Sequence, residues 1–85
     1  MTPDPLSATF AALADPTRAR IVGLLTGGEV CVCHLHETLR IPQSKASRHL
    51  AYLRRAGLVE TEKRGLWVWY RVDPARLDAL RAVLG

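Results

Sequence analysis

The sequence has few of the features that mark membrane proteins, secreted proteins or enzymes. No stretch of the chain approaches the roughly 20 consecutive apolar residues of a membrane-spanning helix. The first residues, MTPDPLS, have neither a basic start nor a continuous apolar run, so we expect no signal peptide and a cytoplasmic protein without a membrane partner. There is no set of nucleophile, base and orienting residue and no glycine-rich phosphate loop, and the chain is short for a deep pocket. These absences argue against an enzyme, and we expect no catalytic residue and no catalytic cofactor.

Apolar residues, by contrast, are abundant for so short a chain. They make up 48% of its 85 residues, which is more than a small monomer easily buries. No internal repeat, low-complexity run or linker divides the sequence, so we expect a single domain over residues 1–85. Dimerisation is a natural way to cover the remaining apolar surface.

Three Asp-Pro pairs indicate helix starts, because Asp suits an N-cap and Pro suits the first helical residue. They are Asp4-Pro5, Asp15-Pro16 and Asp73-Pro74, and each precedes an apolar stripe at helical spacing. The stripes consist of Leu6, Phe10 and Leu13; of Ile21, Leu24 and Leu25, ending at Gly27-Gly28; and of Leu77, Leu80 and Leu84. We interpret Asp15 and Asp73 as helix caps and not as acid–base groups.

The most informative stretch is a cationic helix that runs directly into a hairpin. Pro42 suits the first turn of this helix, and Gly57 suits the left-handed position just past its end. Between them Ala46, Leu50 and Leu53 repeat at helical spacing and fall on one face. The pattern predicts a helix that buries one stripe and leaves a polar, basic face outside.

The segments around this helix complete a recognisable order. We expect a short helix at about His34–Arg40, and strands at Val59–Lys63 and Leu66–Val72 around the turn Arg64-Gly65. The order is α-α-(β)-α-α-β-β-α, mainly α with a small β-hairpin, which is the layout of a winged helix-turn-helix. Aromatic residues crowd the second strand, and we expect at least one of its two tryptophans to lie in the core. They are Trp67 and Trp69, with Tyr70 beside them.

Charge is distributed unevenly along the chain. From Arg40 to Arg71 there are eight Lys or Arg against two acids, so this segment carries +6, whereas four bases and six acids give the remainder −2. A basic half on a slightly acidic body is the electrostatic footprint of a phosphate-binding module. Acidic polymers other than DNA would fit this charge as well.

We expect double-stranded DNA to meet the polar face of the cationic helix and the turn of the hairpin, because short donors and long cations reach base edges and phosphates together. The candidate DNA-binding residues are Gln43, Ser44, Lys45, Ser47, Arg48, His49, Tyr52, Lys63 and Arg64. The alternative for the helix is the ordinary solvated face of an amphipathic helix. For His49, at the border of the apolar face, packing and a hydrogen bond are favoured over a base contact.

Both cysteines lie in one short segment, Glu29–Glu37, which reads EVCVCHLHE. In a cytoplasmic protein a structural disulfide is disfavoured. An extended chain here would point Cys31 and Cys33 to the same side, with Cys33 at or near the N-cap of the short helix and His36 in its first turn. These three residues can converge on one soft ion, and helix N–H groups favour a thiolate there; His34 is a further candidate ligand. The alternative is two half-buried cysteines beside two surface histidines.

Four segments of the chain resemble the ArsR/SmtB family of metal-responsive repressors. They are ALADPTRARIVGLL, EVCVCHL, SKASRHLAYLRRAGLVE and RGLWVWYRV, and the resemblance covers about residues 8 to 73. It implies a homodimeric winged-helix repressor that leaves its operator DNA when a thiophilic ion binds the cysteines at the start of the third helix. The CVC segment resembles the site of arsenite- and cadmium/lead-sensing members, so the first-choice inducer ion is As(III) or Sb(III).

The chain departs from this pattern at the ligand positions. Arsenite sensors of the family commonly read C-V-C-D-L-C, whereas this chain has His34 in place of the Asp and His36 in place of the third Cys. Arsenite can still take two thiolates and a further ligand, but an imidazole donor shifts the preference toward Cd, Zn or Cu-type ions. The last helix contains no His or Cys, so the zinc site that some members build from paired last helices is not expected.

The first and last helices, Pro5–Ala14 and Pro74–Leu84, are not needed by the DNA-reading unit, and we assign their apolar stripes to a homodimer interface. Three classes of function remain open. They are a repressor released by an ion, a repressor switched by oxidation or persulfidation of the same Cys pair, and a nucleic-acid-binding module without a sensor.

Overall fold

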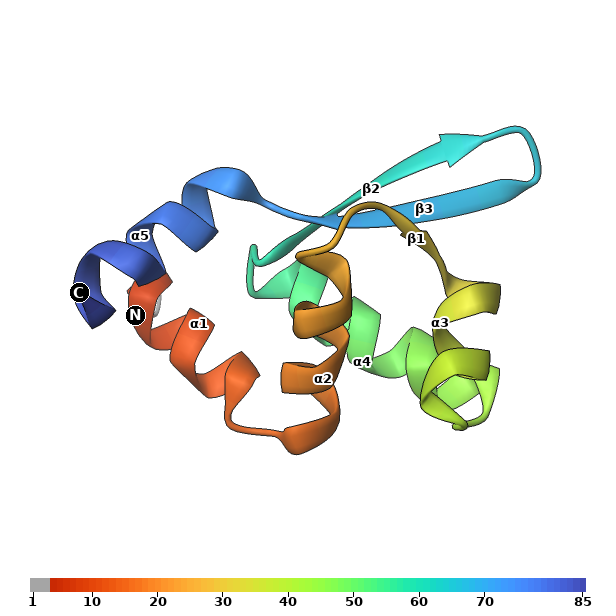
Figure 1. Ribbon diagram of the computed structural model, residues 1–85, viewed down its shortest axis with the longest axis horizontal. Helices are drawn as coiled ribbons and strands as arrows, with labels where there is room; N and C mark the ends of the chain where they lie inside the picture. The colour runs from red at the N-terminus through yellow and green to blue at the C-terminus, as the bar shows by residue number, and fades with distance from the viewer. Residues whose placement is uncertain (1–3) are drawn as a thin grey trace.

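The computed structural model describes residues 4–85, which form five helices and a three-stranded antiparallel sheet (Figure 1). The expectation of no signal peptide rests on residues 1–7, which lie partly outside this range. The elements are α1 Pro5–Leu13, α2 Pro16–Leu25, β1 Val30–Cys31, α3 Val32–Leu39, α4 Gln43–Arg55, β2 Val59–Arg64, β3 Trp67–Val72 and α5 Pro74–Leu84. Helices α3 and α4 form the helix-turn-helix and the β2–β3 hairpin is the wing, so the predicted fold and element order are confirmed. None of the helices described is long and apolar enough to cross a membrane.

The three Asp-Pro pairs stand at helix starts as predicted. Asp15 accepts a hydrogen bond from the Arg18 backbone N–H at 3.0 Å, and Asp73 accepts one from the Ala75 N–H at 3.0 Å. Asp4 occupies the N-cap of α1 without a side-chain hydrogen bond. Pro42 was expected inside the first turn of α4, but its ψ of 146° is extended, so it is the N-cap and the helix begins one residue later.

One hydrophobic core fixes the orientation of α4. Leu50 and Leu53 are fully buried together with Ile21 of α2 and with Leu35 of α3, and Ala46 is buried on the same face of α4. Burial of this stripe turns the opposite, polar face of α4 toward solvent. The predicted amphipathic division of the cationic helix is therefore confirmed.

The end of α4 requires glycine for two reasons. Gly57 has a φ of +79°, which L side chains adopt at a cost, and a Cβ at this position would lie 2.5 Å from Nη2 of Arg76. The Arg76 guanidinium fills this space because it donates hydrogen bonds to the carbonyl oxygens of Ala56 and Pro5, each at 3.0 Å. Arg76 thus ties α5 and α1 to the end of α4.

The sheet has the order β1-β3-β2, and its two faces differ. Val59 pairs with Val72 on the inner face and both are buried in the core, against which Tyr70 also packs. The outer face carries both tryptophans and the side chains of Glu60, Glu62, Arg64 and Arg71, whereas Lys63 lies on the same side of its strand as Val59. The expectation that one Trp belongs to the core is wrong: Trp67 is 57% exposed and Trp69 is half-buried outside the core, because residues 67 and 69 alternate with the inward-facing Tyr70 and Val72.

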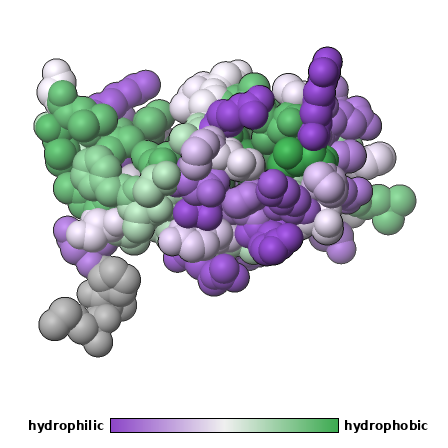
Figure 2. Space-filling model, turned by 90° about the horizontal axis from the view of Figure 1, so that it is seen from below, coloured by the Kyte–Doolittle hydropathy of each residue, from purple (hydrophilic) through white to green (hydrophobic). Residues whose placement is uncertain are grey.

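Helices α1 and α5 lie together at one end of the molecule, where the described part of the chain begins and ends (Figure 1). No residue of α5 is buried, and Phe10, Val83 and Leu84 are exposed. Figure 2 shows apolar side chains gathered at this end and mostly hydrophilic ones toward the middle of the same face. A large share of the apolar surface of this end is therefore left uncovered by the described chain.

Candidate functional site

The two thiols lie together at the start of α3. Cys31 ends β1 and is the N-cap of α3, Cys33 is the second residue of the helix, and the two sulfur atoms share a hydrogen bond at 2.8 Å. Both cysteines are free, since this separation is well above the ~2.05 Å of a disulfide bond. The structure thus brings together the two residues that the sequence proposed as soft ligands.

The local backbone differs from the expectation. We predicted Val32 in extended chain and a helix from about His34, but α3 begins at Val32 and Cys33 lies inside it. The reason is packing: Val32 contacts the core on the same helix face as the buried Leu35 and Leu39, which outweighs the β preference of the Val and Cys residues. The N-cap itself, Cys31, makes no side-chain hydrogen bond to the helix backbone.

The protonation of the pair also differs from the expectation. The hydrogen bond from Cys31 and partial burial raise the pKa of the Cys33 thiol, and they outweigh the backbone N–H groups of the helix start, which act in the opposite direction. We had expected the helix N-terminus to favour a thiolate. The surroundings of Cys33 therefore favour its protonated thiol over the thiolate.

The histidines are divided between two places. His36 is one turn further along α3, with its Nδ1 3.3 Å from the carbonyl oxygen of Ile41 in the turn before α4. Within residues 4–85 no three His, Cys, Asp or Glu side chains come close enough to form a metal site, so His36 is not beside the thiols in this conformation. His34 is exposed and lies on the same pocket as the cysteines.

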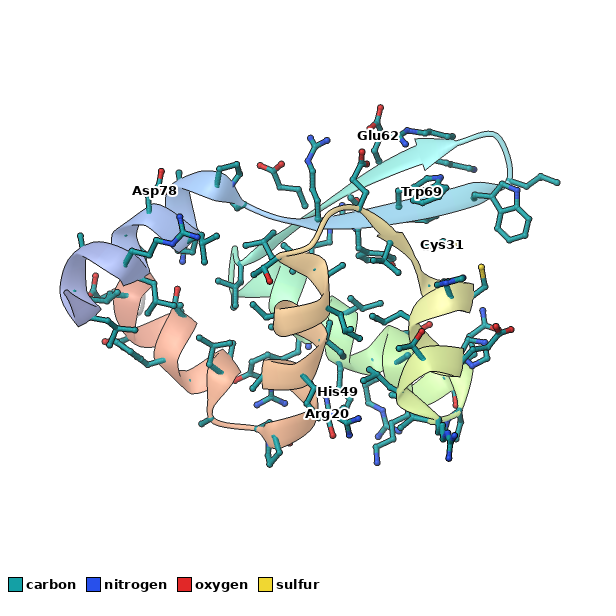
Figure 3. All side chains as sticks on the ribbon, in the orientation of Figure 1. Arg20, Cys31, His49, Glu62, Trp69 and Asp78 are labelled. Atoms are coloured by element: carbon teal, nitrogen blue, oxygen red, sulfur yellow. The ribbon has the colours of Figure 1, made fainter. Side chains whose placement is uncertain are left out.

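This pocket is a feature that the sequence reasoning missed. It has a volume of about 440 Å³ and opens beside the two sulfur atoms, between the start of α3 and the outer face of the wing. Its lining residues are Glu29, Val30, Cys31, Cys33, His34, Trp67 and Trp69. Figure 3 shows Trp69 on β3 near Cys31, with which it pairs across the β1–β3 ladder. The alternation of Trp67 and Trp69 on one strand face was the signal in the sequence, but it did not say which face.

Ion pairs hold the outer face of the wing next to this pocket. Arg64 contacts the carboxylates of Glu29 at 2.8 Å and of Glu62 at 2.7 Å, and Arg71 contacts Glu60 at 2.9 Å. The hydrogen bond from Arg64 lowers the pKa of the Glu62 carboxyl. Arg64, predicted to contact DNA, is therefore shared between two carboxylates, whereas Lys63 takes part in none of the ion pairs among residues 4–85.

The other candidate DNA-binding residues lie on the outer face of α4. His49 is half-buried at the border of the apolar face, and the others on this helix are exposed, with the guanidinium of Arg18 3.9 Å from the centre of the Tyr52 ring. The exposed candidates are Gln43, Ser44, Lys45, Ser47, Arg48 and Tyr52. The structure thus presents one polar helix face, next to a wing, in the arrangement that winged helix-turn-helix proteins use.

Comparison with known proteins agrees with this architecture. Residues 15–61 match the family described as bacterial regulatory protein, arsR family. The chain is 50% identical over 66 residues to an arsenic resistance transcriptional regulator of Pseudomonas putida, covering 76% of this chain and 52% of that protein. It is 53% identical over 66 residues to the arsenical resistance operon repressor of Escherichia coli, covering 76% of this chain and 56% of that protein. The chain spans about half the length of these curated relatives.

A solved structure shows the same fold. The crystal structure of a possible transcriptional regulator for arsenical resistance superposes with a TM-score of 0.80 at 41% identity, and the match covers 98% of this chain and 82% of that one. The family is one of regulators, and this confirms the prediction that the chain has no catalytic role. The chain belongs to the ArsR family of bacterial regulatory proteins.

Proposed function

We propose that this chain is a cytoplasmic transcriptional repressor that holds operator DNA and releases it when a thiophilic ion binds Cys31 and Cys33. The observation that carries the proposal is the pair of sulfur atoms 2.8 Å apart at the start of α3, the helix that leads into α4. The names of the relatives, which are regulators of arsenic resistance, support the same class of ion.

The DNA-reading unit consists of the α3–α4 helix-turn-helix and the β2–β3 wing. It is proposed to place Gln43–Tyr52 in the major groove and Lys63–Arg64 near a phosphate or the minor groove. Support comes from the exposed polar face of α4 and from the excess of basic residues between Arg40 and Arg71. Because exposed ion pairs are weak, DNA phosphates can replace the carboxylates that Arg64 contacts in the free protein.

The operator-binding form is proposed to be a homodimer through α1 and α5. Both helices present apolar side chains that the described chain leaves exposed, among them Phe10 and Leu84, and Leu80 is half-buried. Charged residues placed together at Phe10 and Leu80 should produce a monomer with lost operator affinity, measured by light scattering and DNA binding. A double variant that stays dimeric would move the interface elsewhere.

Arsenite or antimonite is the first-choice inducer. Two thiolates fill two positions of a trivalent ion, and the third can be taken by His34 beside the pocket, by His36 after its ring leaves Ile41, or by water. A tetrahedral zinc-type ion, with Zn–S bonds of about 2.3 Å, sets its sulfur atoms roughly 3.8 Å apart. Cd and Cu-type ions are the alternative inducers, and any ion that bonds both sulfur atoms, arsenic(III) included, would have to spread them from 2.8 Å.

The ion can act on DNA binding through α3. Drawing Cys31 and Cys33 around an ion alters the first turn of α3, and Leu35 and Leu39 transmit the change because they are buried in the core that also holds α4. Release requires that the ion bind the DNA-incompetent form more tightly. A tenfold loss of operator affinity corresponds to about 1.4 kcal/mol of coupling.

An anaerobic operator-release titration tests the proposal. Arsenite, antimonite, cadmium and zinc are added to the unaltered protein, to the Cys31→Ser/Cys33→Ser variant and to His36→Ala. We expect arsenite to release the unaltered protein, the double variant to bind DNA normally without release, and His36→Ala to respond more weakly, most of all to zinc or cadmium. Normal release of the double variant by arsenite would place the sensor elsewhere.

A second arm separates ion sensing from redox sensing. The same titration is repeated with an oxidant or a persulfide donor in place of the ion. Release by oxidant or persulfide alone, with no response to any thiophilic ion, would replace the ion-sensing proposal with a redox switch at the same cysteines. Absence of both responses would leave a DNA-binding module without a sensor.

A further inference from the structure

The thiol pair opens onto a pocket that a bare ion does not require. Its volume of about 440 Å³ is several times the ~150 Å³ of an apolar protein cavity that holds benzene. Two of its walls are formed by Trp67 and Trp69. The pocket therefore has the size and the lining of a site for a small organic group directly beside two sulfur atoms.

The number of sulfur ligands points the same way. Cys31 and Cys33 are the two thiols of the chain, and no third His, Cys, Asp or Glu joins them among residues 4–85. Inorganic arsenite has three exchangeable oxygens and leaves one position unfilled by sulfur. An arsenic(III) atom that carries one carbon substituent has two exchangeable positions, so a pair of thiols satisfies it completely.

The exposure of the aromatic walls supplies a third observation. Trp67 is 57% exposed in the free protein, which leaves an indole in water at the tip of the wing. Trp69 is held in place from the wing side, since the guanidinium of Arg64 lies 5.6 Å from its ring centre. An organic group bound between them would cover apolar ring surface that is otherwise hydrated.

We propose that the site takes trivalent arsenic compounds bearing one organic group, up to the size of a phenyl ring, in preference to inorganic arsenite. This rests on the proposed function, in which the same thiols bind the inducer. Arsenic bonds to both sulfur atoms and the organic group occupies the Trp67–Trp69 pocket. In the reaction of R–As(OH)₂ with two thiols, two As–O and two S–H bonds break, two As–S bonds form and two waters leave. Arsenic stays trivalent, so no oxidant or reductant takes part.

Both tryptophans of the chain line this pocket, so intrinsic fluorescence reports on it directly. The experiment titrates the full chain anaerobically with phenylarsine oxide, which hydrates to the required form, and separately with arsenite. Each titration is run in competition with a small dithiol, because phenylarsine oxide also binds dithiols that have no pocket. Fluorescence and operator release are the two readouts.

The matched variants are Trp67→Ala and Leu66→Ala. Leu66 is 94% exposed at the same hairpin tip but does not line the pocket. For each compound, the affinity of the protein is divided by the affinity of the small dithiol. We expect this ratio to be at least tenfold larger for the phenyl compound than for arsenite. Trp67→Ala should lower the affinity for the phenyl compound about tenfold and leave the affinity for arsenite unchanged. Leu66→Ala should alter neither affinity.

The outcomes separate this inference from the function on which it rests. If arsenite releases the operator through the cysteines but the phenyl compound gains no advantage over the dithiol, or if Trp67→Ala weakens both compounds equally, the organic-group pocket is wrong and the repressor function stands. If neither compound binds the unaltered protein in a Cys31- and Cys33-dependent way, the sensor function itself fails.

Discussion

The two ends of helix α3 are held in different ways. At its C-terminal end the Ile41 N–H donates to the His36 carbonyl at 3.1 Å, the His36 ring meets the Ile41 carbonyl at 3.3 Å, and Leu39 is buried. At its N-terminal end the N-cap, Cys31, makes no side-chain hydrogen bond to the helix, and the thiols contact each other beside an open pocket. We call the C-terminal end, which is tied to the turn before α4, the fastened end, and the N-terminal end, where the thiols border the pocket, the free end.

In the proposed function, this difference lets a ligand at the thiols act on the exposed face of α4. A ligand that bonds both sulfur atoms breaks the hydrogen bond between the two thiols and moves them apart. The displacement cannot be absorbed at the fastened end, since Leu35 and Leu39 share a close-packed core with α4. Substitutions, taken from the largest expected effect to the smallest, test how firmly the C-terminal end of α3 is held and whether the exposed face of α4 binds DNA.

The largest effect is expected from opening the core at the fastened end. Leu39→Ala removes a side chain that is 7% exposed and should cost about 2–5 kcal/mol of unfolding free energy. Cys33→Ala, at the free end and only partly buried, should cost much less, because little packed volume is lost. Urea denaturation of both variants measures the contrast. Equal losses would mean that the two ends of α3 are fastened alike.

A second prediction concerns the surface that α3 is proposed to move. Arg48→Ala on the exposed face of α4 should cost about 1–3 kcal/mol at the operator if Arg48 reads a base. Lys63→Ala on the wing should instead weaken all DNA sequences similarly and lower the salt slope by about one unit. Binding titrations at several salt concentrations, with operator and unrelated DNA, distinguish the two. A salt-independent affinity would contradict a DNA-binding role for both.

The sequence predicted α4 and its C-terminal end better than the segment around the cysteines. The spacing of Ala46, Leu50 and Leu53 fixed α4, and Gly57 fixed its end, because apolar periodicity and left-handed backbone are local properties of the chain. Near the cysteines, local preference and tertiary packing disagree. Val30 and Val32 have equal β propensity, yet the first pairs with Tyr70 in the sheet and the second packs in a helix.

The pocket could not be predicted for a related reason. Trp67 and Trp69 alternate with Tyr70 and Val72, and the pattern alone leaves open which pair faces the core. Only the register with β1, in which Cys31 faces Trp69, places the indoles beside the thiols. Likewise, the position of His36 depends on the turn after α3, where its ring meets Ile41, and not on its spacing from Cys33.

A third prediction compares a glycine just past the end of α4 with a glycine inside α2. Gly57→Ala should destabilise the protein by about 1–2 kcal/mol or more, because the backbone is left-handed and the new Cβ displaces Arg76. Gly23→Ala in α2 is the control, since a Cβ there meets open space, and it should stabilise by about 0.5–1 kcal/mol. Thermal unfolding measures both. In an Arg76→Ala background the penalty at Gly57 should shrink, and an unchanged penalty would assign it to the backbone alone.

The smallest effect is expected at Arg40, the C-cap residue that follows α3. Arg40 has a φ of +56° and a ψ of +45°, a left-handed conformation that costs an L residue about 1–2 kcal/mol, against roughly 0.5–1 kcal/mol for the extra unfolded-state freedom of glycine. Arg40→Gly and Arg40→Ala both remove the charge, so their difference isolates the backbone. We expect the Gly variant to be more stable than the Ala variant by about 1 kcal/mol or less in urea denaturation. A more stable Ala variant would show that α3 does not need this left-handed turn, and that its C-terminal end is less firmly fixed than its hydrogen bonds indicate.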